Sequence, residues 1–196
     1  MTAMKIKSIT RYCSDILHSD KCKNLPFHNF THTQEVIEKT YLISDVMGIK
    51  TEEVDLIVIA ACFHDTGFSE NYEGHEEVSK RLAAQFMEKA NCTKREIERV
   101  LSCIDATKMP QNPHDIYEEI LCDADLFHLG TSNFLYRNML LRKEWELFRD
   151  IVMTDEAWLV LNIKFLEEHQ FKTAYGKEIL EKGKQENLNK LKQLIR

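Results

Sequence analysis

Glycine and proline are scarce in this chain, with 6 and 3 residues among 196. Because turn-rich β proteins need both residue types, their scarcity disfavours an all-β or loop-rich fold. The longest strongly apolar run, Leu56–Phe63, is far shorter than the roughly 20 residues that a membrane-spanning helix needs. The sequence also shows no repeat, no low-complexity tract and no linker rich in Gly, Ser or Pro. These absences predict one globular domain, long enough to bury a sizeable core, with no membrane contact.

The cysteines form no C-x-x-C pair and no dense framework, which predicts reduced thiols rather than disulfides. The opening segment Met1–Lys5 lacks the pattern of a secretory signal, so we expect a cytoplasmic protein. A formal net charge of −6 argues against a surface that binds a nucleic-acid polymer. It leaves a small anionic substrate open, because a bound metal can invert the local field. The six cysteines are Cys13, Cys22, Cys62, Cys92, Cys103 and Cys122.

Apolar residues recur at helical spacing nearly throughout, and no segments suggest paired strands, so the sequence predicts an all-α fold. Thr33 and Thr51 are expected to cap two helices, and Thr93 with Glu96 forms a capping-box pattern before a third. The run Leu56–Phe63 could instead be a strand. The acidic first turn after Thr51 and the glycine that follows the run favour a helix. Asp115 with Glu118 resembles a further cap, and later helices are expected over 131–150, 155–170 and 177–195.

The adjacent pair His64-Asp65 ends the most apolar segment of the chain. A neutral imidazole and a carboxylate side by side offer a nitrogen and an oxygen ligand to one divalent metal. His32 is expected where an earlier helix begins, and Asp123 and Asp125 where a later helix ends. If these helix ends converge, they form a shell of two nitrogens and two oxygens with positions left for water and substrate. Such a shell suits Mn, Fe, Co, Ni or Zn, and Mg remains open.

These motifs together resemble the HD superfamily of metal-dependent phosphohydrolases, which includes cyclic-nucleotide phosphodiesterases. The resemblance implies a single-domain HD-type helical bundle over 1–196, with the metal-binding core at about 27–130 and the C-terminal helices 131–196 packing on it. It covers most of the chain, in blocks that keep their order. The blocks are Phe27–His32, Phe63–Phe68, Gly74–Ser79, Ile104–Lys108 with His114, Asp123–Gly130, and Phe171–Tyr175 with Asn187–Leu188.

The resemblance also implies roles for individual residues. His32, His64, Asp65 and Asp125 match the family's four metal ligands. Asp125 is preferred to Asp123 because Ala-Asp-Leu aligns with the ligand aspartate of the family. Asp123 is then a supporting group beside the ligands.

His28 matches the proton donor of the phosphodiesterases, and Asp65 or Asp125 could accept the proton of the attacking water. His75 could join a second metal, but Thr107 stands where an Ile-x-x-His pattern would supply a further histidine. Other side chains could contact the substrate, or could contact the metal ligands without binding the metal. They are His75, Lys108, His114, Asp123 and His128, with Lys80 and Arg81 as further candidates to neutralise phosphate.

The resemblance implies a phosphohydrolase that cleaves a phosphate mono- or diester, plausibly of a nucleotide, through a metal-activated water. Two alternatives stay open: a regulatory nucleotide-binding domain without turnover, and a di-iron oxygenase of the HD type, which needs more histidine ligands than the chain clearly offers. The expected partner is a small phosphorylated substrate. A homodimer is compatible with the apolar stripe near the C-terminus.

Overall fold

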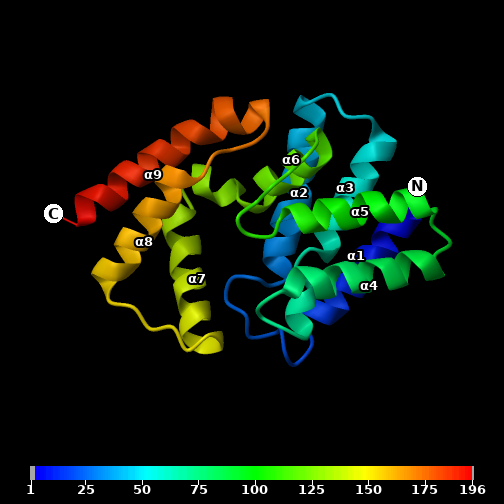
Figure 1. Cartoon of the computed structure of the whole chain (residues 1–196), viewed down its shortest axis with the longest axis horizontal. Coiled ribbons are helices and arrows are strands. Elements are labelled where there is room, and N and C mark those ends of the chain that lie inside the picture. Colours follow the sequence, from blue (N-terminus) through cyan, green and yellow to red (C-terminus); the bar gives the residue numbers. More distant parts are fainter. Residues whose placement is uncertain (1–2, 196) are drawn as a thin grey trace. The chain divides into compact units, whose positions relative to one another are not determined.

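The computed structural model describes residues 3–195, and the side chains of residues 6–195. Met1 and Thr2, on which the expectation about a secretory signal partly rests, lie outside that range. Within residues 3–195 the regular structure is entirely helical, which confirms the all-α prediction (Figure 1). Two compact units divide the chain, Met1–Asp125 and Leu126–Arg196. Among the described helices, each is too short or too polar to cross a bilayer.

The first unit is built around one helix that is buried over most of its length. Helix α3 (Thr51–Phe63) contacts every other α-helix of this unit, and its residues from Ile57 to Phe63 are fully buried. A helix that is apolar on all sides is stable only where neighbours cover all of it. The segment is therefore a central helix and not a strand, as the capping pattern favoured. Around it lie α1 (Ala3–Leu17), α2 (Phe30–Val46), α4 (His75–Lys89), α5 (Lys94–Ala106) and α6 (Ile116–Asp125).

The helix starts match the predicted signals in part. The capping box of Thr93 and Glu96 is present in both directions, as predicted. The prediction that Thr33 caps α2 is wrong, because the cap is Asn29, whose side chain accepts the backbone N–H of His32. Thr33 lies within the first turn and is fully buried. The prediction that Thr51 caps α3 is also wrong, because Thr51 is the first residue of the helix and Lys50 holds the cap position without a side-chain hydrogen bond.

The second unit has its own apolar core. It contains the 3₁₀ turn η2 (Phe127–Gly130), α7 (Phe134–Phe148), α8 (Asp155–Glu168), the π-helical turn η3 (Gly176–Leu180) and α9 (Glu181–Leu194). The backbones of η2 and α9 approach closely, because a Cβ on Gly183 would lie 2.0 Å from the carbonyl oxygen of Gly130. Asn187 holds the same contact by donating to Leu129 O and Thr131 O. The core side chains are Leu129, Phe134, Leu166, Phe171, Leu180, Leu188 and Leu191.

Candidate metal centre

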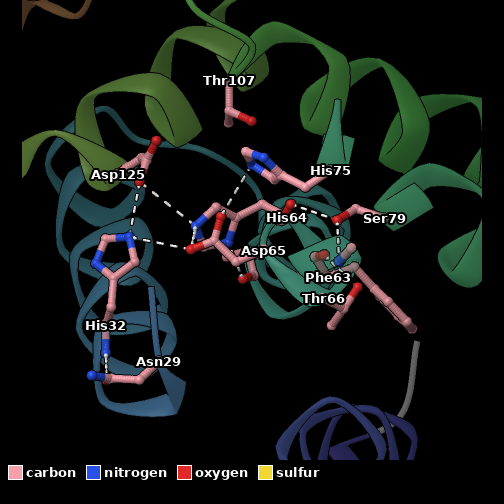
Figure 2. A network of polar contacts seen from close by, with 12 residues as sticks. Asn29, His32, Phe63, His64, Asp65, Thr66, His75, Ser79, Thr107 and Asp125 are labelled. Atoms are coloured by element: carbon pink, nitrogen blue, oxygen red, sulfur yellow. Dashed lines mark hydrogen bonds and ion pairs between the residues drawn. The ribbon is translucent and has the colours of Figure 1, made fainter. Parts of the chain in front are cut away.

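Four side chains from three distant parts of the sequence meet inside the first unit (Figure 2). His32 lies in the first turn of α2, His64 and Asp65 directly follow α3, and Asp125 is the last residue of α6. The structure therefore brings together the four residues that the sequence nominated as ligands. The buried helix α3 fixes the direction of the central pair, because its last turn cannot move without disturbing the core.

The polar atoms of the four side chains form a closed ring. His32 Nε2 lies 3.0 Å from Asp125 Oδ1 and 3.6 Å from Asp65 Oδ2. His64 Nε2 lies 3.1 Å from Asp65 Oδ2 and 3.6 Å from Asp125 Oδ1. Ligand atoms that share one metal at about 2.0–2.2 Å must lie within about 4.4 Å of their neighbours in the shell. All four distances meet this condition. The donor atoms of His32, His64 and Asp125 also lie within 4.8 Å of one another.

The orientation of His64 leaves a lone pair aimed into this ring. Its Nδ1–H donates to the carbonyl oxygen of Ala61 at 2.8 Å, so Nε2 is the unprotonated nitrogen of the neutral ring. Neither His64 Nε2 nor Asp65 Oδ2 has a hydrogen-bond partner within the described part of the chain, although both atoms are buried. Two lone pairs that face each other in a buried site are unfavourable unless a cation lies between them. The residues present therefore fit a divalent metal.

The pKa shifts of the four side chains also indicate a site that favours a cation. Burial lowers the pKa of the His64 imidazole, but Asp65 and Asp125 more than reverse this effect and hold its pKa well above the usual range. Burial dominates at His32 and lowers its pKa. Burial alone would raise the pKa of both carboxyls, but the imidazoles beside them hold the pKa of Asp65 and Asp125 below the ordinary value. Without another cation, a proton on His64 neutralises part of the negative charge.

A clamp of hydrogen bonds fixes the turn that carries the pair. Ser79 Oγ, from α4, donates to His64 O at 2.7 Å and accepts the N–H of Gly67 at 2.8 Å. Thr66 Oγ1 donates to Phe63 O. Gly67 allows α4 to come this close, since a Cβ there would lie 1.9 Å from His75 O. The expectation that Gly67 ends the helix is wrong, because α3 ends at Phe63 and Gly67 lies in the 3₁₀ turn Thr66–Ser69 that follows. Its role there is to make room for the start of α4.

Asn29 is the corresponding support for His32. Its side-chain oxygen accepts the backbone N–H of His32 at 3.2 Å, and its amide donates to Leu25 O and Pro26 O. The Phe27 ring packs against the imidazole with 5.1 Å between centroids. These contacts fix where α2 starts and therefore where its first-turn histidine points.

His28 and His75 lie beside the ring of ligands, on an aromatic cluster. Both imidazoles stack on Phe68, with centroids at 4.5 Å for His28 and 3.9 Å for His75. His75 Nδ1 donates to Tyr72 O, so Nε2 faces Asp65 Oδ1 at 3.6 Å. Asp65 thus presents one oxygen to the ligand ring and the other to His75. The His28 ring lies 5.9 Å from that of His32.

Thr107 lies near the position where a second-metal form would need another histidine. Figure 2 shows it projecting from the end of α5 toward the same region as His75. Its hydroxyl donates to Ile104 O within its own helix. Among the residues drawn there, His75 and Asp65 are the candidates for a second cation, which is fewer ligands than a complete second site requires.

The remaining predicted residues lie in several places. Asp123 is fully buried in α6. Lys108 and His114 line a cavity between α5 and α6. His128 belongs to η2 in the second unit, so its predicted supporting role stays a prediction.

Two proposed phosphate-binding side chains are instead bound to carboxylates. Lys80 contacts Asp105 at 2.5 Å and Glu77 at 2.9 Å. Arg81 donates to Glu70 at 2.6 Å. Their ion pairs neutralise the cations locally, which makes them poor phosphate ligands in this conformation.

Comparisons with known proteins show the family and the fold of this chain. The model of the HD domain family matches residues 29–130, which include all four residues of the ring. A predicted HD superfamily hydrolase from an uncultured Thermotogales bacterium is similar in fold, with a TM-score of 0.64 and 16% identity over 98% of this chain and 91% of that one. A protein from Lactobacillus plantarum has a TM-score of 0.72 and 14% identity over 98% of this chain and 97% of its own. The sequence matches no curated protein.

Proposed function

Since the chain belongs to the HD domain family, we propose that it is a metal-dependent phosphohydrolase that cleaves a phosphate ester of a small molecule. The observation that carries the proposal is the closed ring of His32, His64, Asp65 and Asp125, whose facing nitrogen and oxygen atoms lie 3.0–3.6 Å apart. His32 Nε2 is hydrogen-bonded to Asp125 Oδ1, whereas the buried atoms His64 Nε2 and Asp65 Oδ2 have no hydrogen-bond partner among the described residues. A purely structural cluster would satisfy these atoms with hydrogen bonds.

The four side chains would hold one divalent ion, of the Mn, Fe, Co, Ni, Zn or Mg type. When bound, such an ion supplies Lewis acidity, which lowers the pKa of a water and draws negative charge from a phosphoryl group. The side chain of Asp125 is 17% exposed, whereas those of the other three residues are at most 4% exposed. Water and substrate would therefore approach on the Asp125 side.

The chain itself supplies the groups that move protons. Asp65 Oδ1 lies outside the ligand ring and faces His75, so it can accept a proton from an attacking water. His28 is partly exposed next to His32, and we assign it the donation of a proton to the leaving oxygen. Phe68, on which both histidines stack, holds them at the edge of the centre.

The test is phosphate release from a panel of mono- and diesters, nucleotides included, across Mn, Mg, Fe, Co, Ni and Zn. We expect activity with at least one ion and its loss in His64→Ala and Asp125→Ala. Full activity in either variant contradicts the proposal. Glu98→Gln, which changes an exposed carboxylate on α5, is the control and should keep activity.

The same panel distinguishes the other functions. Nucleotide binding by the metal-loaded protein without turnover would indicate a regulatory domain. Two irons per chain with oxygen uptake would indicate an oxygenase, and the 3.6 Å approach of His75 to Asp65 is the feature that would favour it. Because few further metal ligands lie around His75, a hydrolase with one metal is favoured over an oxygenase with two.

A further inference from the structure

A cavity of about 280 Å³ lies between the end of α5, the loop 107–115 and the start of α6. We call it the α5–α6 cavity. Its lining combines the buried carboxylate Glu118, the ammonium of Lys108 and the polar side chains of Ser102 and Asn112 with the apolar side chains of Met109 and Pro110. Such a mixture of a few directed polar groups and apolar surface is typical of a small-molecule site.

The cavity is connected to the candidate metal centre through α6. Cys122 Sγ donates to Ala106 O at 3.2 Å, and Gln111 Nε2 donates to Cys122 O at 3.2 Å. Cys122 precedes Asp125 by three residues, or roughly 4.5 Å along the helix axis. The loop that forms one wall of the cavity is therefore attached to α6 within one turn of a metal ligand. It also leaves α5 through Thr107, which projects toward His75 (Figure 2).

The charged groups in the lining of the cavity are Glu118, Lys108 and Asp105, and Asp105 is paired with Lys80 outside it. Glu118 and Lys108 therefore give the cavity a direction. Glu118 and Asp125 are seven residues apart, so they lie on one face of α6 about 10 Å from each other. Lys108 lies just after Thr107, at the end of the loop next to the metal centre. None of the ion pairs of the described residues includes Lys108, in contrast to Lys80. An anionic group is thus favoured at one end of the cavity and hydrogen-bond donors at the other.

Glu118 is the group that selects the ligand chemistry. It is only 5% exposed, yet it lines the cavity. Its Oε2 accepts the backbone N–H of His114 at 2.7 Å, which fixes the side chain in place. An ionised carboxylate is an acceptor only and has lone pairs for more than one donor. A complementary ligand must therefore present hydroxyl or amine hydrogens to it.

We infer that the α5–α6 cavity holds the hydroxylated, non-reacting part of the substrate, with Glu118 accepting hydrogen bonds from sugar hydroxyls. The inference rests on the proposed function and narrows it to phosphate esters of a sugar or a nucleoside. Lys108 contacts an anionic oxygen of the ester near the metal centre, and Met109 with Pro110 forms an apolar wall. A sugar phosphate and a nucleoside monophosphate share this chemistry.

The experiment compares Glu118→Gln with the wild type, both loaded with Mn²⁺. Glutamine keeps the shape and an oxygen for the His114 N–H but lacks the charge. Equilibrium binding is measured for adenosine monophosphate, for ribose 5-phosphate and for phenyl phosphate, which has no hydroxyl groups. Glu98→Gln is the matched control, and manganese content with thermal unfolding shows that each variant is folded and loaded.

We expect Glu118→Gln to weaken both sugar-containing ligands by about tenfold or more, the usual size of a hydrogen bond to a charged group. Phenyl phosphate should change by less than about twofold. Tighter binding of the nucleotide than of ribose 5-phosphate in the wild type assigns the site to nucleosides, and equal binding assigns it to sugar phosphates. An unchanged affinity for the sugar-containing ligands overturns the inference. So does an equal loss for phenyl phosphate, or failure of the wild type to bind either sugar phosphate.

Turnover of p-nitrophenyl phosphate separates this inference from the proposed function. If p-nitrophenyl phosphate is turned over but Glu118→Gln does not change ligand affinity, the protein is a phosphohydrolase and the subsite is refuted. If ligand affinity depends on Glu118 but no ester is turned over, the subsite is supported and the proposed phosphohydrolase function is refuted.

Discussion

His64 Nε2 lies 3.1 Å from Oδ2 of Asp65, and neither buried atom has a hydrogen-bond partner among the described residues. The two side chains follow one another in the sequence and both point to the same place, because the end of α3 is fixed by the core and by Ser79. A proton or a metal must lie between such atoms for the site to be stable. This competition between a proton and a metal determines how the centre should respond to pH.

Metal binding should release about one proton per chain at pH 7, and the proton should come from His64. The neighbouring carboxylates raise the pKa of His64, whereas burial lowers that of His32, and both aspartates are already ionised. Titration calorimetry in buffers of different ionisation enthalpy measures the number. Release of no proton would contradict the assignment.

The stability of the metal-free protein should fall as the pH rises, whereas its metal affinity should increase. Because the folded-state pKa of His64 is raised, its contribution to stability is complete below the unfolded value of about 6.5 and is lost as the pH rises through the folded value. Metal affinity should rise over the same interval. Chemical denaturation of the metal-free protein from pH 6 to 9 tests this sign. His64→Gln should remove the dependence, whereas a slope that persists in His64→Gln would assign it to another group.

Ser79→Ala should weaken metal binding although Ser79 touches no ligand atom. The variant loses the hydroxyl that joins His64 O to the N–H of Gly67, and it leaves two buried backbone groups without that partner. We expect a loss of about 1–3 kcal/mol in stability and a weaker affinity for Mn²⁺. Denaturant unfolding and metal titration measure the two effects. Ser8→Ala, at an exposed position of α1, should show neither.

Gly67→Ala should be far more damaging than Gly74→Ala. A methyl group on Gly67 would lie 1.9 Å from His75 O, whereas a methyl group on Gly74 meets nothing within 4 Å. Gly74 has φ of +70°, so its replacement costs only the strain of a left-handed alanine, about 1 kcal/mol. Metal affinity and unfolding of the two variants provide the comparison. Equal effects would show that the close approach of α4 is unimportant.

His169 in the second unit should make the protein sensitive to mild acid. Burial, with help from Lys184 and Lys172, lowers the pKa of His169 to about 4. Stability that is complete above pH 6.5 should therefore fall as the pH decreases toward 4, by on the order of 3 kcal/mol. His169→Phe should flatten this part of the curve relative to the wild type. An unchanged curve would mean that the ring is solvated when charged.

The convergence of His32, His64, Asp65 and Asp125 was predictable from sequence because these residues are chemically distinctive and lie at the ends of strongly patterned helices. His64-Asp65 after an apolar run and Asp125 before a glycine-terminated turn carry that information. The all-α fold was predictable for the same reason, since few glycines and prolines interrupt the helical periodicity.

The supporting residues were not predictable, because their roles depend on contacts between separate helices. Ser79 contacts the turn after α3 from the separate helix α4, and the sequence around Ser79 contains no pattern that predicts this contact. Asn29 carried a usable signal, since asparagine is among the strongest helix caps, but Thr33 competed for the same role. Lys80 and Arg81 suggested phosphate binding, and only the positions of Asp105, Glu77 and Glu70 show that they are paired.

The central claim is that His32, His64, Asp65 and Asp125 share one cation. Elemental analysis of the wild type and of Asp125→Asn, each saturated with Mn²⁺ or Zn²⁺ and then dialysed, tests it most directly. We predict one metal ion per chain in the wild type and a loss of at least about tenfold in affinity in the variant, which keeps the size of the side chain but not its charge. A wild type that binds no transition ion, or a variant that retains it fully, would contradict the claim.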